Sequence, residues 1–127
     1  MGRDMAQGDR VLVCTAWPYA NGPIHLGHVA GNFLPGDIFA RFHRLSGSEV
    51  LMVSGSDQHG TPITVQAEET GTTPGEVAGR YHHMNRDALR GVGISFDLYL
   101  YTTHPAHKSA VQAFFLRLLE NGHIFEQ

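Results

Sequence analysis

Two short stretches of this sequence hold most of the side chains that could bind or transform a ligand. In the first, His25 and His28 stand three residues apart with Gly27 between them. That spacing puts both imidazoles on one face of a helix start, and the glycine leaves backbone open to a flat ligand. Amides at a helix amino terminus favour anions, and imidazoles beside them can donate to phosphate oxygens. The stretch predicts a phosphate or nucleotide site, and the alternative is a pair of solvated histidines.

The second stretch spans residues 55–62 and contains Asp57, Gln58 and His59. Its carboxylate could bind a cationic group of a ligand, or it could cap a helix or a turn. His59 follows Asp57 by two residues. We therefore expect His59 to contact a ligand or to shape the pocket.

Each stretch follows a short apolar run of the kind that forms a buried parallel strand. The first run, residues 11–17, ends at Pro18 and predicts a strand buried on both faces; the second covers residues 50–53. Between them, the sequence predicts a helix that starts near residues 24–27 and runs to about residue 45. Pro35-Gly36 in its interior should kink or split it. Ligands of parallel sheets bind beyond the carboxyl ends of the strands, so we expect both stretches at one edge.

The rest of the chain continues the same alternation of helices and strands. Thr61-Pro62 predicts a helix with Thr61 as N-cap and Gly71 at its end, and the capping-box pattern at residues 73–76 predicts a helix to about residue 90. Residues 96–102 predict a strand or an extended connector, and a last helix should begin near Pro105 and end at Gly122. The predicted fold is α/β: a Rossmann-like parallel sheet with crossover helices over residues 10–127, after a flexible leader at 1–9.

Two helices carry apolar stripes at helical spacing. In the first helix the stripe that we expect to face the core consists of Ile38, Phe39, Phe42 and Leu45. In the last helix the stripe consists of Ala110, Val111, Phe114, Phe115, Leu118 and Leu119. If the chain were a non-catalytic fragment, the second stripe could instead await a partner.

Composition indicates one folded domain without a strong charge. The chain has 127 residues, 42% of them hydrophobic and 17% charged, and a net charge of −3. The sequence has no run of Lys and Arg that could contact successive phosphates of a nucleic acid. We therefore do not expect this segment alone to bind nucleic acid. The single Cys14 excludes an internal disulfide and is expected to pack in the core. With no signal-like segment and no apolar run of about 20 residues, a cytoplasmic protein that does not enter membranes is expected.

Nine histidines also raise the possibility of a metal-binding or redox module. One cysteine and no third ligand at compact spacing argue against it, so no metal site is predicted. The adjacent His82 and His83 should be solvated, and His43 and His123 should lie on the surface. His104 and His107 flank a helix start, where they could cap the helix or contact phosphate.

Residues 19–28, Tyr-Ala-Asn-Gly-Pro-Ile-His-Leu-Gly-His, resemble the first signature region of the class I aminoacyl-tRNA synthetases in its methionine form. Gly-Ser-Asp-Gln-His-Gly-Thr-Pro-Ile at 55–63 is similar to the second element of that family, and residues 93–97 and 101–103 with His107 look like later family segments. The valine, leucine and isoleucine enzymes differ at both elements. The resemblance extends over roughly residues 11–124.

This resemblance implies a role for each matching residue. The ATP site would consist of Tyr19, Ala20, Asn21, Gly22, His25, Gly27 and His28, with His25 and His28 as the catalytic pair. The methionine site would consist of Trp17, Tyr19, Asp57 and His59, where Asp57 binds the α-ammonium group with help from the Trp17 backbone. Trp17 stands where some family members have Leu, which puts the shape of the pocket rim in doubt.

The resemblance implies ATP-dependent activation of methionine to methionyl-adenylate, followed by transfer to tRNA(Met) through parts beyond this chain. Mg²⁺ would come with ATP, and zinc is expected only in a connective domain that this chain does not contain. The Lys-Met-Ser-Lys-Ser loop is absent as well, so we expect the chain alone to be weakly active or inactive. The alternative is a small nucleotidylyltransferase of the His-x-Gly-His type, in which we would not expect the second element.

Overall fold

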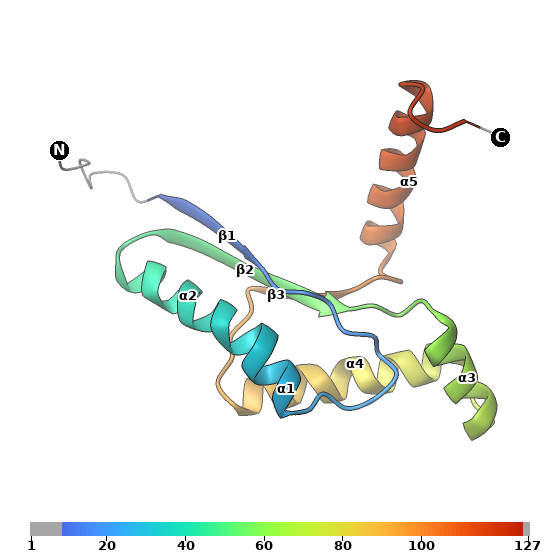
Figure 1. The fold of residues 1–127 in the computed structure, drawn as a ribbon, viewed down its shortest axis with the longest axis horizontal. Helices are drawn as coiled ribbons and strands as arrows, with labels where there is room; N and C mark the ends of the chain where they lie inside the picture. The colour runs from blue at the N-terminus through green and yellow to red at the C-terminus, as the bar shows by residue number, and fades with distance from the viewer. Residues whose placement is uncertain (1–8, 126–127) are drawn as a thin grey trace.

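A computed structural model describes residues 9–125 and shows a three-stranded parallel sheet with the order β1-β2-β3 (Figure 1). The strands are β1 Arg10–Cys14, β2 Glu49–Ser56 and β3 Leu98–Tyr101. Val13 pairs with Met52 and Val53 pairs with Leu98, so β2 is the central strand. Parallel neighbours require crossover connections, and helices supply both of them. The expected α/β fold with a Rossmann-like parallel sheet is confirmed.

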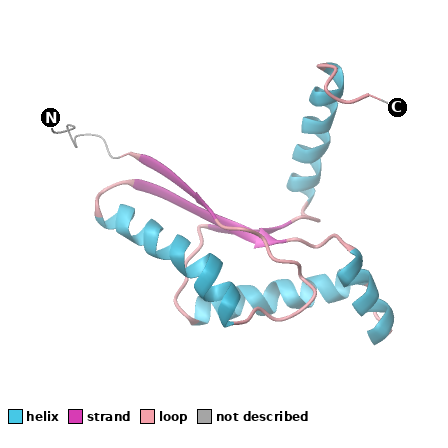
Figure 2. Ribbon diagram, viewed as in Figure 1, coloured by secondary structure: helices cyan, strands magenta, loops and turns pink. Residues whose placement is uncertain are grey.

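The helical segments follow the predicted order along the chain. They are α1 Leu26–His28, the π-helix η1 Val29–Phe33, α2 Leu34–Leu45, α3 Thr61–Thr70, α4 Pro74–Gly91 and α5 Pro105–Glu120. Figure 2 shows α2 and α4 together on one side of the sheet, while α5 stands away from the sheet. None of the helices formed by the described residues is long and apolar enough to cross a membrane.

The interruption expected at Pro35 takes the form of a π-turn. The Leu34 N–H donates to Val29 O, five residues back, and α2 then begins with Pro35 in its first turn. A proline is tolerated there because the first amides of a helix have no partner within the helix. The helix from α1 to α2 therefore changes hydrogen-bond register instead of breaking.

The main core lies between the sheet and α2 and α4. Its buried members are Val13, Phe33, Ala40, Met52, Leu89 and Ile94. The expected stripe of α2 is not part of this core, so that prediction is wrong: Ile38, Phe39, Phe42 and Leu45 are all exposed, Leu45 by 89%. Gly36 explains the orientation, because a Cβ there would lie 2.6 Å from Thr15 Cγ2. The helix approaches the sheet where it has no side chain.

The expectation that the first strand is buried on both faces is also wrong. Val13 is buried, but its neighbour Leu12 is 62% exposed and Cys14 is exposed. In a strand, alternate side chains point to opposite faces, and the described helices pack on only one of them (Figure 1). The strand ends at Cys14, before the predicted end at residue 17. Cys14 therefore does not pack in the core.

The helix ends follow the predicted capping chemistry with one correction. The capping box of Thr73 and Glu76 is present, and Gly71 takes the left-handed conformation after α3. Thr61 is the first residue of α3 and not its N-cap, which is Gly60 with φ 137°. Only glycine adopts that φ readily. The cap was therefore assigned one residue too late.

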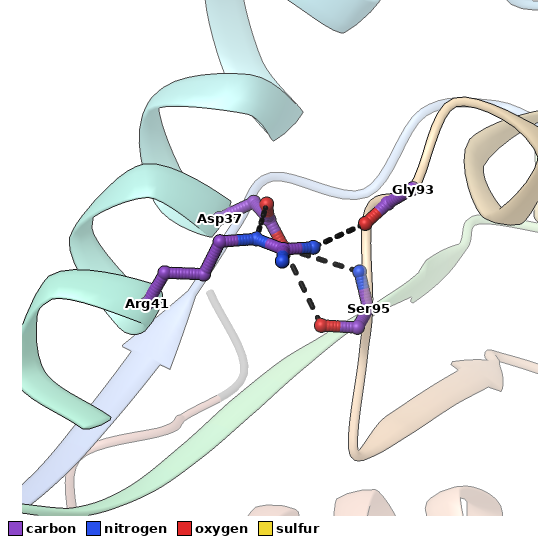
Figure 3. Close-up of polar contacts among 4 residues, drawn as sticks. All are labelled: Asp37, Arg41, Gly93 and Ser95. Atoms are coloured by element: carbon purple, nitrogen blue, oxygen red, sulfur yellow. Dashed lines mark hydrogen bonds and ion pairs between the residues drawn. The ribbon is translucent and has the colours of Figure 1, made fainter. Parts of the chain in front are cut away.

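A buried carboxylate ties α2 to the loop before β3 (Figure 3). Asp37 is 4% exposed, and its Oδ1 accepts a hydrogen bond of 3.1 Å from the Ser95 N–H. Arg41, one turn later on α2, pairs with Asp37 Oδ2 and donates to Gly93 O. A buried charge needs such partners. The loop that leads into β3 is thus held to α2.

Candidate functional site

The two chemical stretches meet beyond the carboxyl ends of β1 and β2. The Ala20 N–H donates to Asp57 O at 2.8 Å and the Asp57 N–H donates to Pro18 O at 2.9 Å, which forms a parallel bridge between Tyr19 and Asp57. These bonds extend the β1–β2 pairing into the loops. Both predicted stretches therefore belong to one edge of the sheet, as their positions after the strands indicated.

Two aromatic side chains of the first loop rest on two glycines, Gly55 near the end of β2 and Gly60 in the loop that follows it. A Cβ at Gly55 would lie 2.7 Å from the Trp17 ring and 2.3 Å from Leu100 O. A Cβ at Gly60 would lie 3.2 Å from the Tyr19 ring. The loops pack this closely because both glycines lack side chains.

A cavity of about 440 Å³ opens beside the first loop. Its lining is formed by Ala16, Trp17, Pro18, Tyr19, Asn21, Gly22, Pro23, Ile24, His28 and Asn32. Five of the predicted ligand residues are in this set: Trp17, Tyr19, Asn21, Gly22 and His28. Ala20 does not line the cavity, because its side chain is fully buried against α3 and α4.

His25 and His28 form a compact pair with ring centroids 3.9 Å apart. His25 is the N-cap of α1: its Nδ1 accepts from the Gly27 N–H at 3.0 Å, and His28 Nδ1 accepts from the His25 N–H at 3.2 Å. A neutral imidazole that accepts at Nδ1 carries its proton on Nε2. Each ring can therefore donate from Nε2 to a ligand. His25 and Gly27 are exposed, whereas His28 lines the cavity.

Asp57 contacts residues that line this cavity and residues that line a second one. Its Oδ1 accepts from the His59 N–H at 3.0 Å and from the Thr102 hydroxyl at 3.3 Å. The second cavity, of about 490 Å³, is lined by His59, Thr102, Thr103, His107, Lys108, Val111 and Gln112. The ring centroids of Trp17 and His107 are 5.9 Å apart, so Trp17 connects the two cavities. The structure thus brings Asp57 and His59 together and places Trp17 beside His107, another residue of the second cavity.

Two asparagines hold the first loop, and sequence reasoning missed both. The Ala16 N–H donates to Asn32 Oδ1 at 3.1 Å, and Asn32 Nδ2 donates back to Ala16 O at 2.9 Å. The Ile24 N–H donates to Asn85 Oδ1 at 2.9 Å, and Asn85 Nδ2 donates to Gly22 O at 3.0 Å. The available signal for Asn85 was an amide on the buried face of α4, between Ala78 and Leu89.

His82 corrects the expectation that both adjacent histidines are solvated. Its side chain is 4% exposed, and its Nδ1 lies 3.1 Å from Ser56 Oγ. Burial, assisted by the positive charges of His83 and Arg86, lowers the pKa of His82 from 6.5 to about 4. His83 is exposed as expected. The packed face of α4 passes through residue 82 and not through 83, which adjacency alone did not reveal.

The other histidines have structural or peripheral positions. His104 is the N-cap of α5, since its Nδ1 accepts from the Ala106 N–H at 3.2 Å. His43 is half-buried beside the rings of Phe39 and Phe42, and His123 is exposed. Within residues 9–125, no cluster of three or more His, Cys, Asp or Glu side chains could hold a metal ion.

Comparisons with known proteins place this chain in a family. The model of the class I tRNA synthetases of the methionine type matches residues 11–127. Methionine–tRNA ligase of Roseiflexus castenholzii is 54% identical over 119 residues, which are 94% of this chain and 20% of that protein. The enzyme of that name from Thermoplasma volcanium is 53% identical over 115 residues, covering 91% of this chain and 21% of the relative. The chain therefore spans about a fifth of the length of these relatives.

A solved structure of a class I synthetase is also similar to this chain. It is the ternary complex of the Agrobacterium radiobacter K84 LeuRS with tRNA and LeuAMS, which matches with a TM-score of 0.81 at 28% identity over 94% of this chain and 16% of that chain. The family match covers both sequence elements, including the second, which we do not expect in a small nucleotidylyltransferase. The chain belongs to the class I tRNA synthetases, in their methionine family.

Proposed function

We propose that residues 10–127 form the amino-terminal half of a Rossmann-like catalytic domain in a methionine–tRNA ligase and contribute its ATP and methionine sites. The family match and the relatives' names support the enzyme class. The bridge between Tyr19 and Asp57 supports a shared site, because it joins the two loops that would hold the two substrates.

The observation that carries this proposal is the hydrogen bonding of the histidine pair. His25 and His28 each accept a backbone N–H at Nδ1, so the neutral rings carry their protons on Nε2. Two such donors suit phosphate oxygens. We infer that the triphosphate of ATP lies against this pair, over Gly27. Tyr19, Ala20, Asn21 and Gly22 would form the adjoining part of the ATP site.

The reaction at this site would need positioning more than proton transfer. A carboxylate oxygen of methionine attacks the α-phosphorus of ATP, the bond from that phosphorus to the bridging oxygen of pyrophosphate breaks, and methionyl-adenylate forms. The nucleophile is already ionised, so no general base is required. The Nε2 donors of His25 and His28 would stabilise the negative charge that develops on the phosphate oxygens. Mg²⁺ would be held mainly by the triphosphate.

Methionine would bind on the other side of the Tyr19–Asp57 bridge. Both hydrogen bonds that the Asp57 side chain makes with described residues use Oδ1, so we infer that the carboxylate can also take the α-ammonium group. The Trp17 backbone would assist, and Tyr19 and His59 would shape the pocket. In the second half-reaction a ribose hydroxyl of the terminal adenosine of tRNA(Met) would attack the methionyl carbonyl and release AMP.

The test is amino-acid-dependent exchange of pyrophosphate into ATP by the full-length protein that carries this chain. We expect exchange with methionine and little with leucine or valine. Asp57→Asn should raise the KM for methionine. Exchange that requires no amino acid, but a phosphate-containing acceptor, would favour a nucleotidylyltransferase. The present chain alone should show little or no exchange.

The histidine pair permits a matched set of variants. His28→Asn keeps an acceptor near the Nδ1 position but has no donor near Nε2, so kcat should fall about 100-fold. His28→Gln places an amide N–H nearer the Nε2 position and should recover part of that loss. His83→Asn, on the exposed side of α4, should leave exchange unchanged. Equal rates for His28→Asn and wild type would contradict the assigned role.

A further inference from the structure

Asn85 connects the buried face of α4 to the loop that precedes the histidine pair. Its side chain is 1% exposed, and its amide makes two hydrogen bonds with one short segment of backbone. The Ile24 N–H donates to Oδ1 at 2.9 Å, and Nδ2 donates to Gly22 O at 3.0 Å. One side chain therefore holds both ends of residues 22–24.

Among the described residues, little else fixes the Gly22 end of that segment. Residues 22–24 form no helix or strand, and a Cβ at Gly22 would meet nothing within 4 Å. The Ile24 end packs against the edge of the main core. All three residues line the first cavity. The position of this wall of the cavity therefore depends on the Asn85 amide at the glycine end.

The same bonds bear on His25, which directly follows Ile24. The hydrogen bonds of His25 with Gly27 and His28 set the two rings relative to each other. The direct continuation of α1 into η1 and α2 positions His28. Immediately before His25, the described side chain that binds the backbone of residues 22–24 is Asn85.

Only an amide satisfies both partners. A carboxylate can accept from the Ile24 N–H, but it would face Gly22 O with no proton to donate. An aliphatic side chain of similar size would leave both backbone groups without their partner, and unpaired buried groups move to find others.

We propose that Asn85 is a positioning residue of the ATP site: it sets residues 22–24, and with them the cavity wall and His25, in the place where the nucleotide binds. It does not touch the substrate itself. The proposal rests on the proposed function, since it assigns the cavity beside His28 to ATP. The methionine site at Asp57 is held by other bonds, to Pro18, Ala20 and Thr102, and should be independent of Asn85.

The test measures pyrophosphate exchange by the full-length protein with Asn85→Leu and Asn85→Asp. For Asn85→Leu, which loses two hydrogen bonds, we expect roughly a tenfold or greater rise in the KM for ATP. Asn85→Asp keeps one acceptor and should lie between Asn85→Leu and wild type. The KM for methionine should stay within about twofold in both variants, because the two sites are held separately.

Thr73→Ala is the matched control for a general loss of stability. It removes the N-cap of the same helix, α4, without touching residues 22–24. It should lower the melting temperature and leave the KM for ATP unchanged. If Thr73→Ala raises that KM as much as Asn85→Leu does, or if both substrates are affected equally by Asn85→Leu, the positioning role is wrong.

Hydrogen exchange separates this proposal from the proposed function. In the full-length protein, Asn85→Leu should raise the exchange rate of the Ile24 amide by roughly tenfold or more, because that amide loses its buried acceptor. An unchanged Ile24 rate would overturn the proposal. A wild-type protein that shows no methionine-dependent exchange would refute the proposed function, and the Ile24 amide would still decide whether Asn85 holds the loop.

Discussion

The buried imidazole of His82 should make the stability of this chain fall as the pH is lowered. In the folded state burial holds the pKa of His82 at about 4, whereas the value for an unfolded chain is 6.5. Between these two values the unfolded state binds a proton that the folded state does not. Lowering the pH through this range therefore favours unfolding, and the full stability is present above pH 6.5.

The size of the effect follows from the two titrations. From pH 7.5 to pH 5, this single group should lower the free energy of unfolding by about 2 kcal/mol, and well below pH 4 the loss should approach about 3 kcal/mol. For a chain of this size, 2 kcal/mol corresponds to a shift of roughly 1 M in the urea midpoint. Such a shift is easily measured by circular dichroism.

A variant pair isolates the contribution of His82. His82→Asn keeps an acceptor for the Ser56 hydroxyl and should flatten the pH dependence by about 2 kcal/mol over this range. His83→Asn, which changes the exposed neighbour, should retain the dependence of wild type. An independent measurement is the NMR titration of the His82 Cε1 proton, which should show no step above pH 5. The reasoning is refuted if His82→Asn keeps the wild-type pH slope or if His82 titrates near 6.5.

Three further predictions test the packing. Gly55→Ala should destabilise the chain by about 2–3 kcal/mol in urea titrations, since the new Cβ would overlap Leu100 O and Trp17. The control Gly79→Ala, which has open space around it in α4, should stabilise the chain by about 0.5–1 kcal/mol. Equal effects of the two variants would contradict the close packing at Gly55. Asp37→Ala should lower the free energy of unfolding by about 2–3 kcal/mol, far more than a change of a surface carboxylate, because the Ser95 amide loses its acceptor. An unchanged free energy of unfolding would disprove the role of Asp37 in holding the loop before β3 to α2. Cys14 should react with Ellman's reagent in the native chain nearly as fast as in urea, and strong native protection would show that it is covered.

The order of elements and the edge of the sheet that carries the site were predictable, because both depend on local patterns. Apolar runs ended by turn residues predicted β1 and β2, and the capping box at Thr73 predicted the start of α4. Once strands alternate with helices, the topology puts the loops after β1 and β2 beside each other. The meeting of Tyr19 with Asp57 required no knowledge of side-chain packing.

Interactions between distant residues were not predictable in the same way. Asn85 and Gly22 are 63 residues apart, and the buried position of Asn85 depends on where α4 crosses the loop. The same is true of His82, whose partner Ser56 lies 26 residues earlier. A polar side chain on the buried face of a helix predicts a hydrogen bond, but its partner can be named only when the packing is known.

The orientation of α2 shows why hydrophobicity alone misled the prediction. Ile38 and Phe42 are larger and more apolar than Gly36 and Asp37, so a count of apolar area turns the former toward the core. Close approach to the sheet instead selects Gly36, whose missing side chain admits Thr15, and the neighbouring Asp37 is buried because Ser95 and Arg41 satisfy it. The outer apolar face is then left exposed among the described residues. Where a small residue permits contact and a buried carboxylate finds its partners, those two conditions together outweigh the burial of larger side chains.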